Sequence, residues 1–160
     1  MIIKSKFMVS LISIVTHPGN IGGGCILFSY IVELKSTFES VDTTVRNMMD
    51  IISNQWGIQS SNKIFSLNLV LRELLNNAVE HGNRMVEEKK VVCKIVYCSK
   101  EVCIEVTDEG EGFSPSELKK YDTNDYADIF RERGRGLLIM RGMGFDVSVN
   151  KNHVTAKMNI

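Results

Sequence analysis

Glu73-Leu-Leu-Asn-Asn77 lies in a helical stretch and is the segment on which the fold assignment depends. At about 100° per residue, its polar side chains share one helix face: Glu73, Asn76, Asn77 and Glu80. Apolar residues recur at helical spacing on the opposite face: Leu67, Leu71, Leu74, Leu75 and Ala78. This spacing predicts an amphipathic helix over residues 62–80, which His81-Gly82-Asn83 ends.

The polar face of this helix has two interpretations. For a generic helix, the simpler one is a solvated surface. Two adjacent Asn residues within a helix are unfavourable by propensity, however, which favours a functional role. The carbonyl oxygen of Asn77 is a hard ligand of the kind that Mg²⁺ prefers. Glu73, one turn away, is placed to orient or deprotonate a nucleophile beside a metal-bound phosphate.

Regular patterns surround this helix on both sides. Alternation predicts strands over residues 31–38, 91–98 and 101–107, with a hairpin turn at Ser99-Lys100. A helix is expected from Ser40 as N-cap to Trp56, with Gly57 ending it. A further helix opens at Gly136, and strands over 145–149 and 154–160 close the chain. Helices grouped against a mixed, mostly antiparallel sheet predict an α+β fold, a two-layer α/β sandwich.

A second motif, Asp108-Glu-Gly-Glu-Gly112, follows the strand over 101–107 directly. Two glycines separated by one residue let the backbone turn sharply and approach a flat ligand closely. Asp108, at the strand end, can accept a hydrogen bond from an exocyclic amine such as that of adenine. The alternative is an ordinary turn rich in Asp and Gly.

The third motif, Arg133-Gly-Arg-Gly-Leu137, opens an apolar helix. Free N–H groups and the helix dipole make such a start an anion site, and Arg131, Arg133 and Arg135 can serve as phosphate partners. The alternative is a helix entry with solvated arginines. The glycines form neither GxxxxGK[ST] nor GxGxxG after a first βα unit, which disfavours P-loop and Rossmann sites.

The composition limits the function classes but selects none. The chain has 160 residues, enough for one domain with a sizeable core. Lys plus Arg and Asp plus Glu both number 19, so no overall field favours nucleic acid or an anionic membrane. Four cysteines without CxxC or metal-type spacing indicate reduced thiols and a cytoplasmic location: Cys25, Cys93, Cys98 and Cys103.

The first 29 residues form a separate N-terminal extension in this interpretation, and residues 30–160 form the domain. The apolar run over 7–15 is too short to span a bilayer, and no small-residue cleavage site follows it. Gly22-Gly-Gly24 is typical of a flexible joint. We expect the extension to be flexible or loosely docked, with a targeting segment or an added strand, for example at a subunit contact, as the alternatives.

The three motifs, in this order, resemble those of the GHKL ATPases, which include gyrase B, Hsp90, histidine-kinase catalytic domains and MutL. The resemblance covers residues 30–160 and is greatest to the stand-alone anti-sigma-factor serine kinases. Residues 73–82 resemble the N box, residues 108–112 the G1 box and residues 133–137 the G2 box. The implied fold is the Bergerat fold, and the implied cofactors are ATP and Mg²⁺.

The resemblance also implies roles for individual residues. Glu73 would be the general base and Asn77 the Mg²⁺ ligand. Asp108 would bond the adenine amino group, helped by Thr155. The family often has Gly-Thr where this chain has Val154-Thr155, which puts the water network beside the adenine in doubt.

The glycine-rich motifs supply the rest of the implied site. Gly110 and Gly112 would shape the base pocket, and residues 113–133 would form a mobile lid. The terminal phosphates would be held by the third motif: Arg133, Gly134, Arg135, Gly136 and Leu137.

By this resemblance the protein is a serine/threonine kinase that phosphorylates a small STAS-type antagonist and, when free, sequesters a sigma factor. A homodimer is also implied, with no nucleic acid and no membrane as partners. A nucleotide-gated switch with little turnover is the alternative. A histidine-kinase fragment is disfavoured because neither His17 nor His153 lies in a dimerisation helix. Machines of the gyrase, Hsp90 or MutL type need transducer domains for which 160 residues leave no room.

Overall fold

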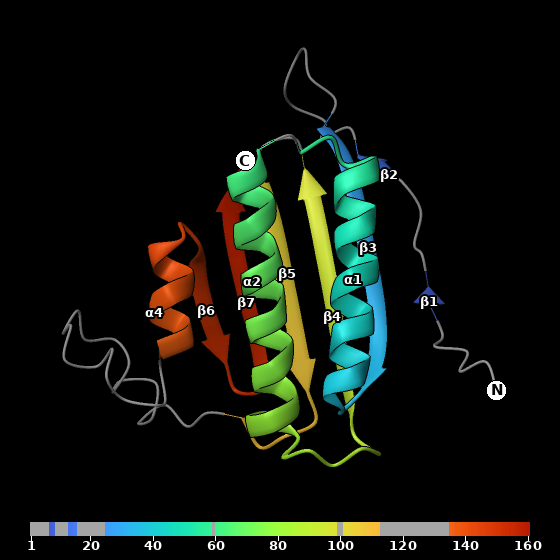
Figure 1. Cartoon of the computed structure of the whole chain (residues 1–160), viewed down its shortest axis with the longest axis vertical. Coiled ribbons are helices and arrows are strands. Elements are labelled where there is room, and N and C mark those ends of the chain that lie inside the picture. The colour runs from blue at the N-terminus through green and yellow to red at the C-terminus, as the bar shows by residue number, and fades with distance from the viewer. Residues whose placement is uncertain (1–6, 9–12, 16–24, 59, 99–100, 113–134) are drawn as a thin grey trace.

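The structure is a computed structural model of the chain. It describes residues 7–8, 13–15, 25–58, 60–98, 101–112 and 135–160. Within these residues, two long helices cover one face of an antiparallel sheet (Figure 1). The predicted α+β, two-layer fold is therefore confirmed.

The sheet has the strand order β1-β3-β4-β5-β7-β6, and β2 also pairs with β3. Every pairing among the described strands is antiparallel, so this part of the chain shows none of the parallel pairing that a mixed sheet would allow. The strands are β1 (Phe7–Met8), β2 (Ser13–Val15), β3 (Cys25–Lys35), β4 (Lys90–Cys98), β5 (Glu101–Asp108), β6 (Asp146–Asn150) and β7 (His153–Asn159).

Strand β3 differs most from its expected bounds. It begins at Cys25 rather than residue 31 and ends at Lys35, so it crosses the expected domain boundary at residue 30. Its first half is an apolar run without the alternation that would predict a strand. This segment is a strand because it pairs with β2 on one side and with β4 on the other. The described parts of the extension, β1 and β2, add to the β3 edge of the sheet.

Helix α1 (Phe38–Gln55) begins earlier than expected. Its N-cap is Thr37, whose hydroxyl accepts a hydrogen bond from the Ser40 N–H at 3.2 Å. The prediction of Ser40 as N-cap was wrong because β3 ends at Lys35 and the chain turns into the helix within two residues. Gly57 follows the C-cap with φ +66°, as expected of the residue that ends a helix.

Helix α2 (Ser61–Asn77) carries the first motif and continues into a single π-helical turn, η1 (Ala78–Gly82). The Asn83 N–H donates to the Ala78 carbonyl at 2.8 Å, which closes the wider turn. The predicted helix over 62–80 is confirmed, although its last turn is π-helical. Turns of this kind are frequent at functional sites.

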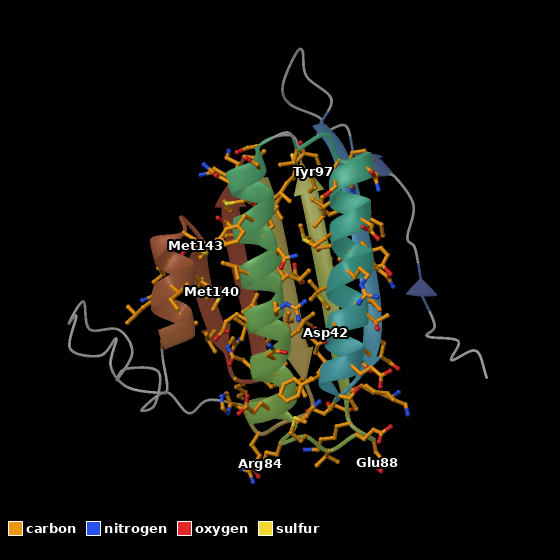
Figure 2. The ribbon with its side chains drawn as sticks, in the orientation of Figure 1. Asp42, Arg84, Glu88, Tyr97, Met140 and Met143 are labelled. Atoms are coloured by element: carbon orange, nitrogen blue, oxygen red, sulfur yellow. The ribbon has the colours of Figure 1, made fainter. Side chains whose placement is uncertain are left out.

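Helix α4 (Arg135–Gly142) opens one residue before Gly136, where the sequence predicted a helix start. It lies beside β6 at the other edge of the sheet from β3 (Figure 1). Met140 of α4 is buried and Met143 is half-buried (Figure 2). The described part of the third motif, Arg135–Leu137, is the first turn of this helix and is held against the sheet with it.

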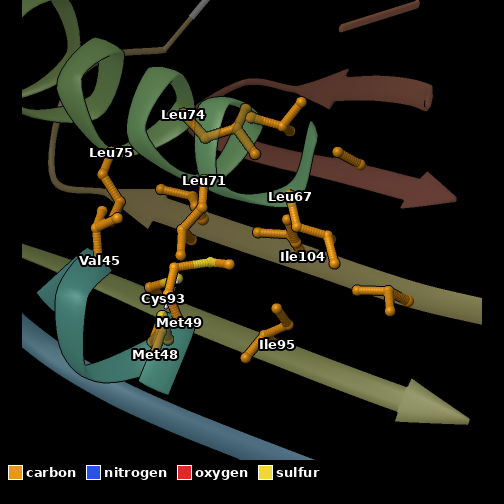
Figure 3. Packing of buried hydrophobic residues seen from close by; sticks show 14 of the residues in the cluster. Val45, Met48, Met49, Leu67, Leu71, Leu74, Leu75, Cys93, Ile95 and Ile104 are labelled. Atoms are coloured by element: carbon orange, nitrogen blue, oxygen red, sulfur yellow. Dashed lines mark hydrogen bonds between the residues drawn. The ribbon is translucent and has the colours of Figure 1, made fainter. Parts of the chain in front are cut away.

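The core lies between the sheet and the helices α1 and α2 (Figure 3). The apolar stripe predicted for α2 is buried, and the alternation predicted for β5 is confirmed. Burying one such aliphatic side chain stabilises the fold by about 1.5–3 kcal/mol. Among the residues at the centre of this layer are Val45, Met48, Leu67, Leu71, Leu75, Cys93, Ile95 and Ile104.

The cysteines differ in state. Cys93 and Cys103 are free, whereas Cys98 is disulfide-bonded, so the expectation of reduced thiols was wrong for Cys98. Complete burial raises the pKa of the Cys93 thiol to about 12. In the part of the chain that the structure describes, no helix combines the length and apolarity needed to cross a membrane.

Candidate functional site

Glu73 and Asn77 lie together on the polar face of α2. The Asn77 side-chain amide donates a hydrogen bond to Glu73 Oε1 at 3.2 Å, as the i, i+4 spacing predicts. Both side chains are half-buried, whereas Leu74 and Leu75 between them are buried. With its nitrogen on Glu73, Asn77 keeps its carbonyl oxygen available for a cation.

The backbone of α4 meets this pair. A Cβ atom at Gly136 would collide with Glu73 Oε1, and it would lie 3.0 Å from Cδ. Only glycine fits here without displacing the carboxylate. Gly136 of the third motif therefore lies directly against Glu73 of the first, although the two residues are 63 positions apart in sequence.

Arg135 and Leu137 of the third motif flank Gly136 in the first turn of α4. Leu137 is half-buried and packs against the core. The backbone of Arg135 is helical. Arg133 and Gly134, like the expected lid over 113–133, lie outside the described residues.

Asp108 stands at the end of β5, beside the π-helical turn. A Cβ atom at Gly82 would collide with its carboxylate, so η1 and the Asp108 side chain are in close contact. The Gly110 N–H donates to Asp108 Oδ1 at 2.7 Å. In the described part of the chain, the second carboxylate oxygen, Oδ2, has no hydrogen-bond donor. It is the acceptor that an adenine amine would require.

Burial shifts the pKa of this carboxyl group. Desolvation raises the pKa of Asp108 above its ordinary value, while the Gly110 N–H and the charge of Lys89 oppose the shift. A half-buried carboxyl group with a perturbed pKa, against which glycine backbone packs, is typical of a binding site.

The two glycines of the second motif are needed for space and for backbone angle. A Cβ atom at Gly110 would collide with the Gly82 carbonyl. Gly112 has φ +73°, and a Cβ atom there would collide with the backbone of Lys151 and Asn152 in the β6–β7 turn. The motif is therefore a tight turn held between η1 and the β6–β7 turn.

Asn152 fastens this turn to the end of β5. Its carbonyl accepts a hydrogen bond from the Asp108 N–H at 3.1 Å, and its side-chain amide donates to the Asp108 carbonyl. The sequence around Asn152 carries no local signal for this role, because its partner Asp108 lies 44 residues away.

Asn83 is the second residue that sequence reasoning missed. Its side chain is fully buried and accepts a hydrogen bond from the Glu109 N–H at 2.7 Å. It also donates to Ser36 and to the Lys90 carbonyl. A buried Asn directly after a helix end is a weak sequence signal, since Asn is also common there as an exposed cap.

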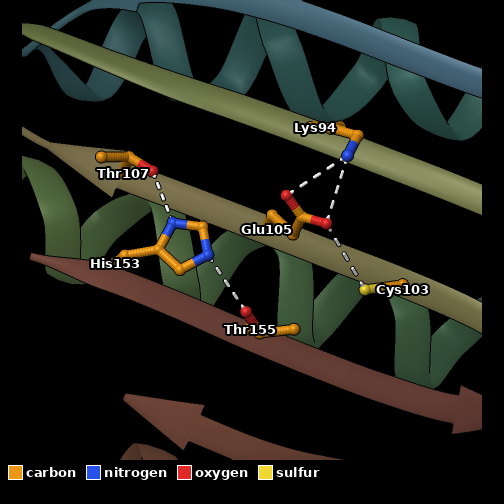
Figure 4. Close-up of polar contacts among 6 residues, drawn as sticks. All are labelled: Lys94, Cys103, Glu105, Thr107, His153 and Thr155. Atoms are coloured by element: carbon orange, nitrogen blue, oxygen red, sulfur yellow. Dashed lines mark hydrogen bonds and ion pairs between the residues drawn. The ribbon is translucent and has the colours of Figure 1, made fainter. Parts of the chain in front are cut away.

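Thr155 does not join the other candidate residues. Along β5 the buried residues face the helices, and Asp108, two positions after Val106, shares their face. Thr155 pairs with Glu105, which points to the opposite face. There Thr155 Oγ1 lies 3.2 Å from His153 Nε2 (Figure 4).

The residue of β7 on the Asp108 face is Val154, the partner of Val106. A shift of one residue reverses the face of a strand side chain, and the pairing with β5 sets the register of β7. The side of the site next to Asp108 is therefore apolar where a threonine was expected.

The arrangement fits a magnesium nucleotide. Asn77 offers a hard oxygen ligand, Glu73 a carboxylate beside it and Asp108 a free acceptor, and the glycines at 82, 110 and 136 allow the backbone to pack directly against these groups. No group of three or more His, Cys, Asp or Glu side chains suited to a metal is found among the described residues. Mg²⁺ takes few protein ligands and keeps waters and phosphate oxygens, so the carbonyl oxygen of Asn77 is a ligand of the type that it uses.

The chain was compared with curated proteins and with protein-family models. A search among curated proteins finds no match to the chain. The family model described as "Histidine kinase-like ATPase domain" matches residues 34–159, which include all three motifs. The chain therefore belongs to the histidine kinase-like ATPase family and contains its ATP-binding domain.

Proposed function

We propose that this protein is an ATP-dependent serine/threonine protein kinase of the anti-sigma-factor type. Its substrate would be a small STAS-type antagonist protein, and the free kinase would sequester a sigma factor. The observation that supports catalysis is the carboxylate of Glu73 beside Asn77, because a nucleotide-binding switch needs no carboxylate at this position.

The contacts of Glu73 leave it able to act as a base. One carboxylate oxygen, Oε1, accepts from Asn77 and lies against Gly136. These contacts fix the rotamer of the side chain, and Oε2 has no hydrogen-bond partner among the described residues. A substrate hydroxyl that donates to Oε2 can transfer its proton there as the phosphoryl group arrives.

The other residues of the site bind and orient the reactants. ATP with Mg²⁺ would supply the phosphoryl group. Asp108 Oδ2 would accept from the adenine amine, and the Asn77 carbonyl oxygen would contribute one metal ligand. The close approach of Gly136 would hold the phosphate-binding end of α4 beside the base.

Transfer of labelled phosphate tests this function. The protein is incubated with γ-labelled ATP, Mg²⁺ and STAS-type proteins encoded near it, and phosphoserine or phosphothreonine is identified by mass spectrometry. Wild type should label one of these proteins. Glu73→Gln, which keeps the shape of the side chain, should bind ATP normally and transfer about 10²- to 10⁴-fold more slowly. Absence of transfer to any hydroxyl by wild type would contradict kinase activity.

The second candidate function is a nucleotide-gated switch that grips its partner with little turnover. The hydrogen bond between Asn77 and Glu73 favours it, since this contact also suits a purely structural role. In that case Glu73→Ala should leave nucleotide-dependent binding of the partner intact. Loss of partner control in this variant would argue against the switch.

The proposed function includes an oligomeric state and a cellular location for the protein. We expect a cytoplasmic homodimer, and light scattering coupled to size exclusion would give its mass. A monomer at concentrations where the partner binds would contradict the dimer but not the kinase activity.

A further inference from the structure

Asn83 is the only fully buried side chain with a carboxamide among the described residues. Burying an amide is unfavourable unless its polar atoms are bonded, and Asn83 satisfies this with three contacts. Oδ1 accepts from the Glu109 N–H at 2.7 Å, while Nδ2 donates to Ser36 Oγ at 2.6 Å and to the Lys90 carbonyl at 2.9 Å. The amide orientation is unambiguous because a peptide N–H only donates and a carbonyl only accepts.

Together with a further bond from Lys90, these bonds form a closed ring that includes one residue of the second motif, Glu109. The Lys90 N–H donates to Glu109 Oε2 at 2.7 Å, and the Lys90 carbonyl accepts from Asn83. Asn83, Glu109 and Lys90 are thus linked in pairs. The start of β4 and the residue after Asp108 are therefore held at a fixed separation from the end of η1.

The same short segment also contacts the Asp108 carboxylate. Gly82, the neighbour of Asn83, packs directly against it, and the Gly110 N–H donates a hydrogen bond to its Oδ1. The backbone at 82–83 and the turn at 109–110 therefore enclose the carboxylate. The hydrogen bond between Asn83 and the Glu109 N–H sets the distance between these two segments.

We propose that Asn83 is a positioning residue for base recognition: it orients the free Asp108 oxygen toward the exocyclic amine of a 6-aminopurine nucleotide. This inference depends on the adenine contact assigned to Asp108 but not on kinase activity. Ser36 and Lys90 anchor Asn83 to the β3–α1 turn and to β4. Loss of Asn83 should therefore leave the Asp108 carboxylate less precisely positioned. It should leave the phosphate end of the site unchanged.

The test compares Mg-ATP with Mg-ITP, which carries a carbonyl in place of the exocyclic amine. Calorimetric titration of each nucleotide gives a ratio of affinities that depends on the base alone. Wild type should prefer ATP. Asn83→Leu, which removes all three bonds, should reduce this preference by about tenfold, the equivalent of one lost hydrogen bond, with ITP affinity nearly unchanged.

Two further variants separate positioning from stability. Ser36→Ala removes one Asn83 contact without touching the second motif, so the ATP preference should be unchanged. Asn83→Asp keeps the acceptor for the Glu109 N–H but loses both donated bonds, so its ATP preference should fall below that of wild type, by less than in Asn83→Leu. This decrease relative to wild type can still be measured if Asn83→Leu does not fold. Melting curves recorded alongside would confirm that each variant is folded at the titration temperature.

The outcomes are distinct. An ATP preference equal to that of wild type in a folded Asn83→Leu variant, or in Asn83→Asp if Asn83→Leu does not fold, would overturn the positioning role. Equal affinity of wild type for ATP and ITP would overturn it as well, together with the Asp108 assignment. Neither result would bear on phosphate transfer through Glu73.

Discussion

At the scale of single residues, contact between distant motifs defines the candidate site. Gly136 touches Glu73, and Gly82 touches Asp108, so two glycines place backbone against two carboxylates. The first pair joins the third motif to the first motif. The second pair joins η1, the turn that follows the first motif, to the second motif. Side chains at either glycine position would force these carboxylates to move.

Gly136→Ala should reduce phosphate transfer by about tenfold or more with little loss of stability. The added Cβ collides with Glu73 Oε1, whereas alanine is otherwise favourable within a helix. Gly142→Ala on the same helix is the matched control, because a Cβ atom there meets nothing within 4 Å. Steady-state transfer rates and melting temperatures check this pair. Equal activity of Gly136→Ala and wild type would show that the Glu73 position is not critical.

Asp108 should also make stability depend on pH. Burial raises the pKa of its carboxyl group above 3.8, so the folded protein binds this proton more tightly than the unfolded chain does. The resulting stabilisation is complete below the unfolded pKa and is lost as the pH rises through the folded pKa. The free energy of unfolding of wild type should therefore fall relative to Asp108→Asn across this window.

The size of this pH effect is below about 1 kcal/mol, because the carboxylate is only half-buried and solvent screens it. Urea titrations of wild type and Asp108→Asn at several pH values measure it. A wild type that gains stability over the variant as the pH rises would contradict the direction of the shift.

At the scale of elements, alternation and helical spacing predicted most of the strands and helices. Burial along α2, β4 and β5 follows the patterns seen in the sequence, because each has one face on the core. The features that were missed depend on partners far along the chain. The first half of β3 is defined by its neighbours, and Thr155 faces away from Asp108 because β5 sets the register of β7. The contacts of Asn83 and Asn152 could not be predicted from the sequence for the same reason.

The N-cap of α1 offers a test at this scale. Thr37→Ala should lower the free energy of unfolding by about 1 kcal/mol, since it removes the acceptor for the Ser40 N–H. Ser40→Ala is the control and should cost less, because it removes only the hydrogen bond between the two hydroxyls at 2.9 Å and leaves the Ser40 N–H capped by Thr37. Denaturant titrations of the two variants decide which residue is the cap. A larger loss for Ser40→Ala would restore Ser40 as the N-cap.

At the scale of the molecule, the helices cover one face of the sheet, and the candidate site lies at one end of this layer (Figure 1). The C-terminal end of α2, the end of β5 and the β6–β7 turn meet there. Arg84 and Glu88 mark the same end of the molecule (Figure 2). The opposite face of the sheet carries polar contacts, among them Thr107 with His153 and Lys94 with Glu105 (Figure 4).

Cys93 reports on the integrity of the whole layer. It is fully buried in β4 near Met48 of α1, and burial raises the pKa of its thiol to about 12. Iodoacetamide should therefore label Cys103 in the native protein but Cys93 only when the sheet and helices separate. Peptide mass spectrometry after timed labelling distinguishes the two sites. Rapid native labelling of Cys93 would contradict the packing of α1 on β4.

The measurement that tests the nucleotide site most directly is a calorimetric titration of Mg-ATP into wild type and Asp108→Asn. The substitution keeps the shape of the side chain but replaces a carboxylate oxygen with an amide donor that repels the adenine amine. Wild type should bind ATP, and Asp108→Asn should bind at least about tenfold more weakly. Equal affinity of the two proteins for ATP would contradict the assignment of this end of the molecule as the adenine site.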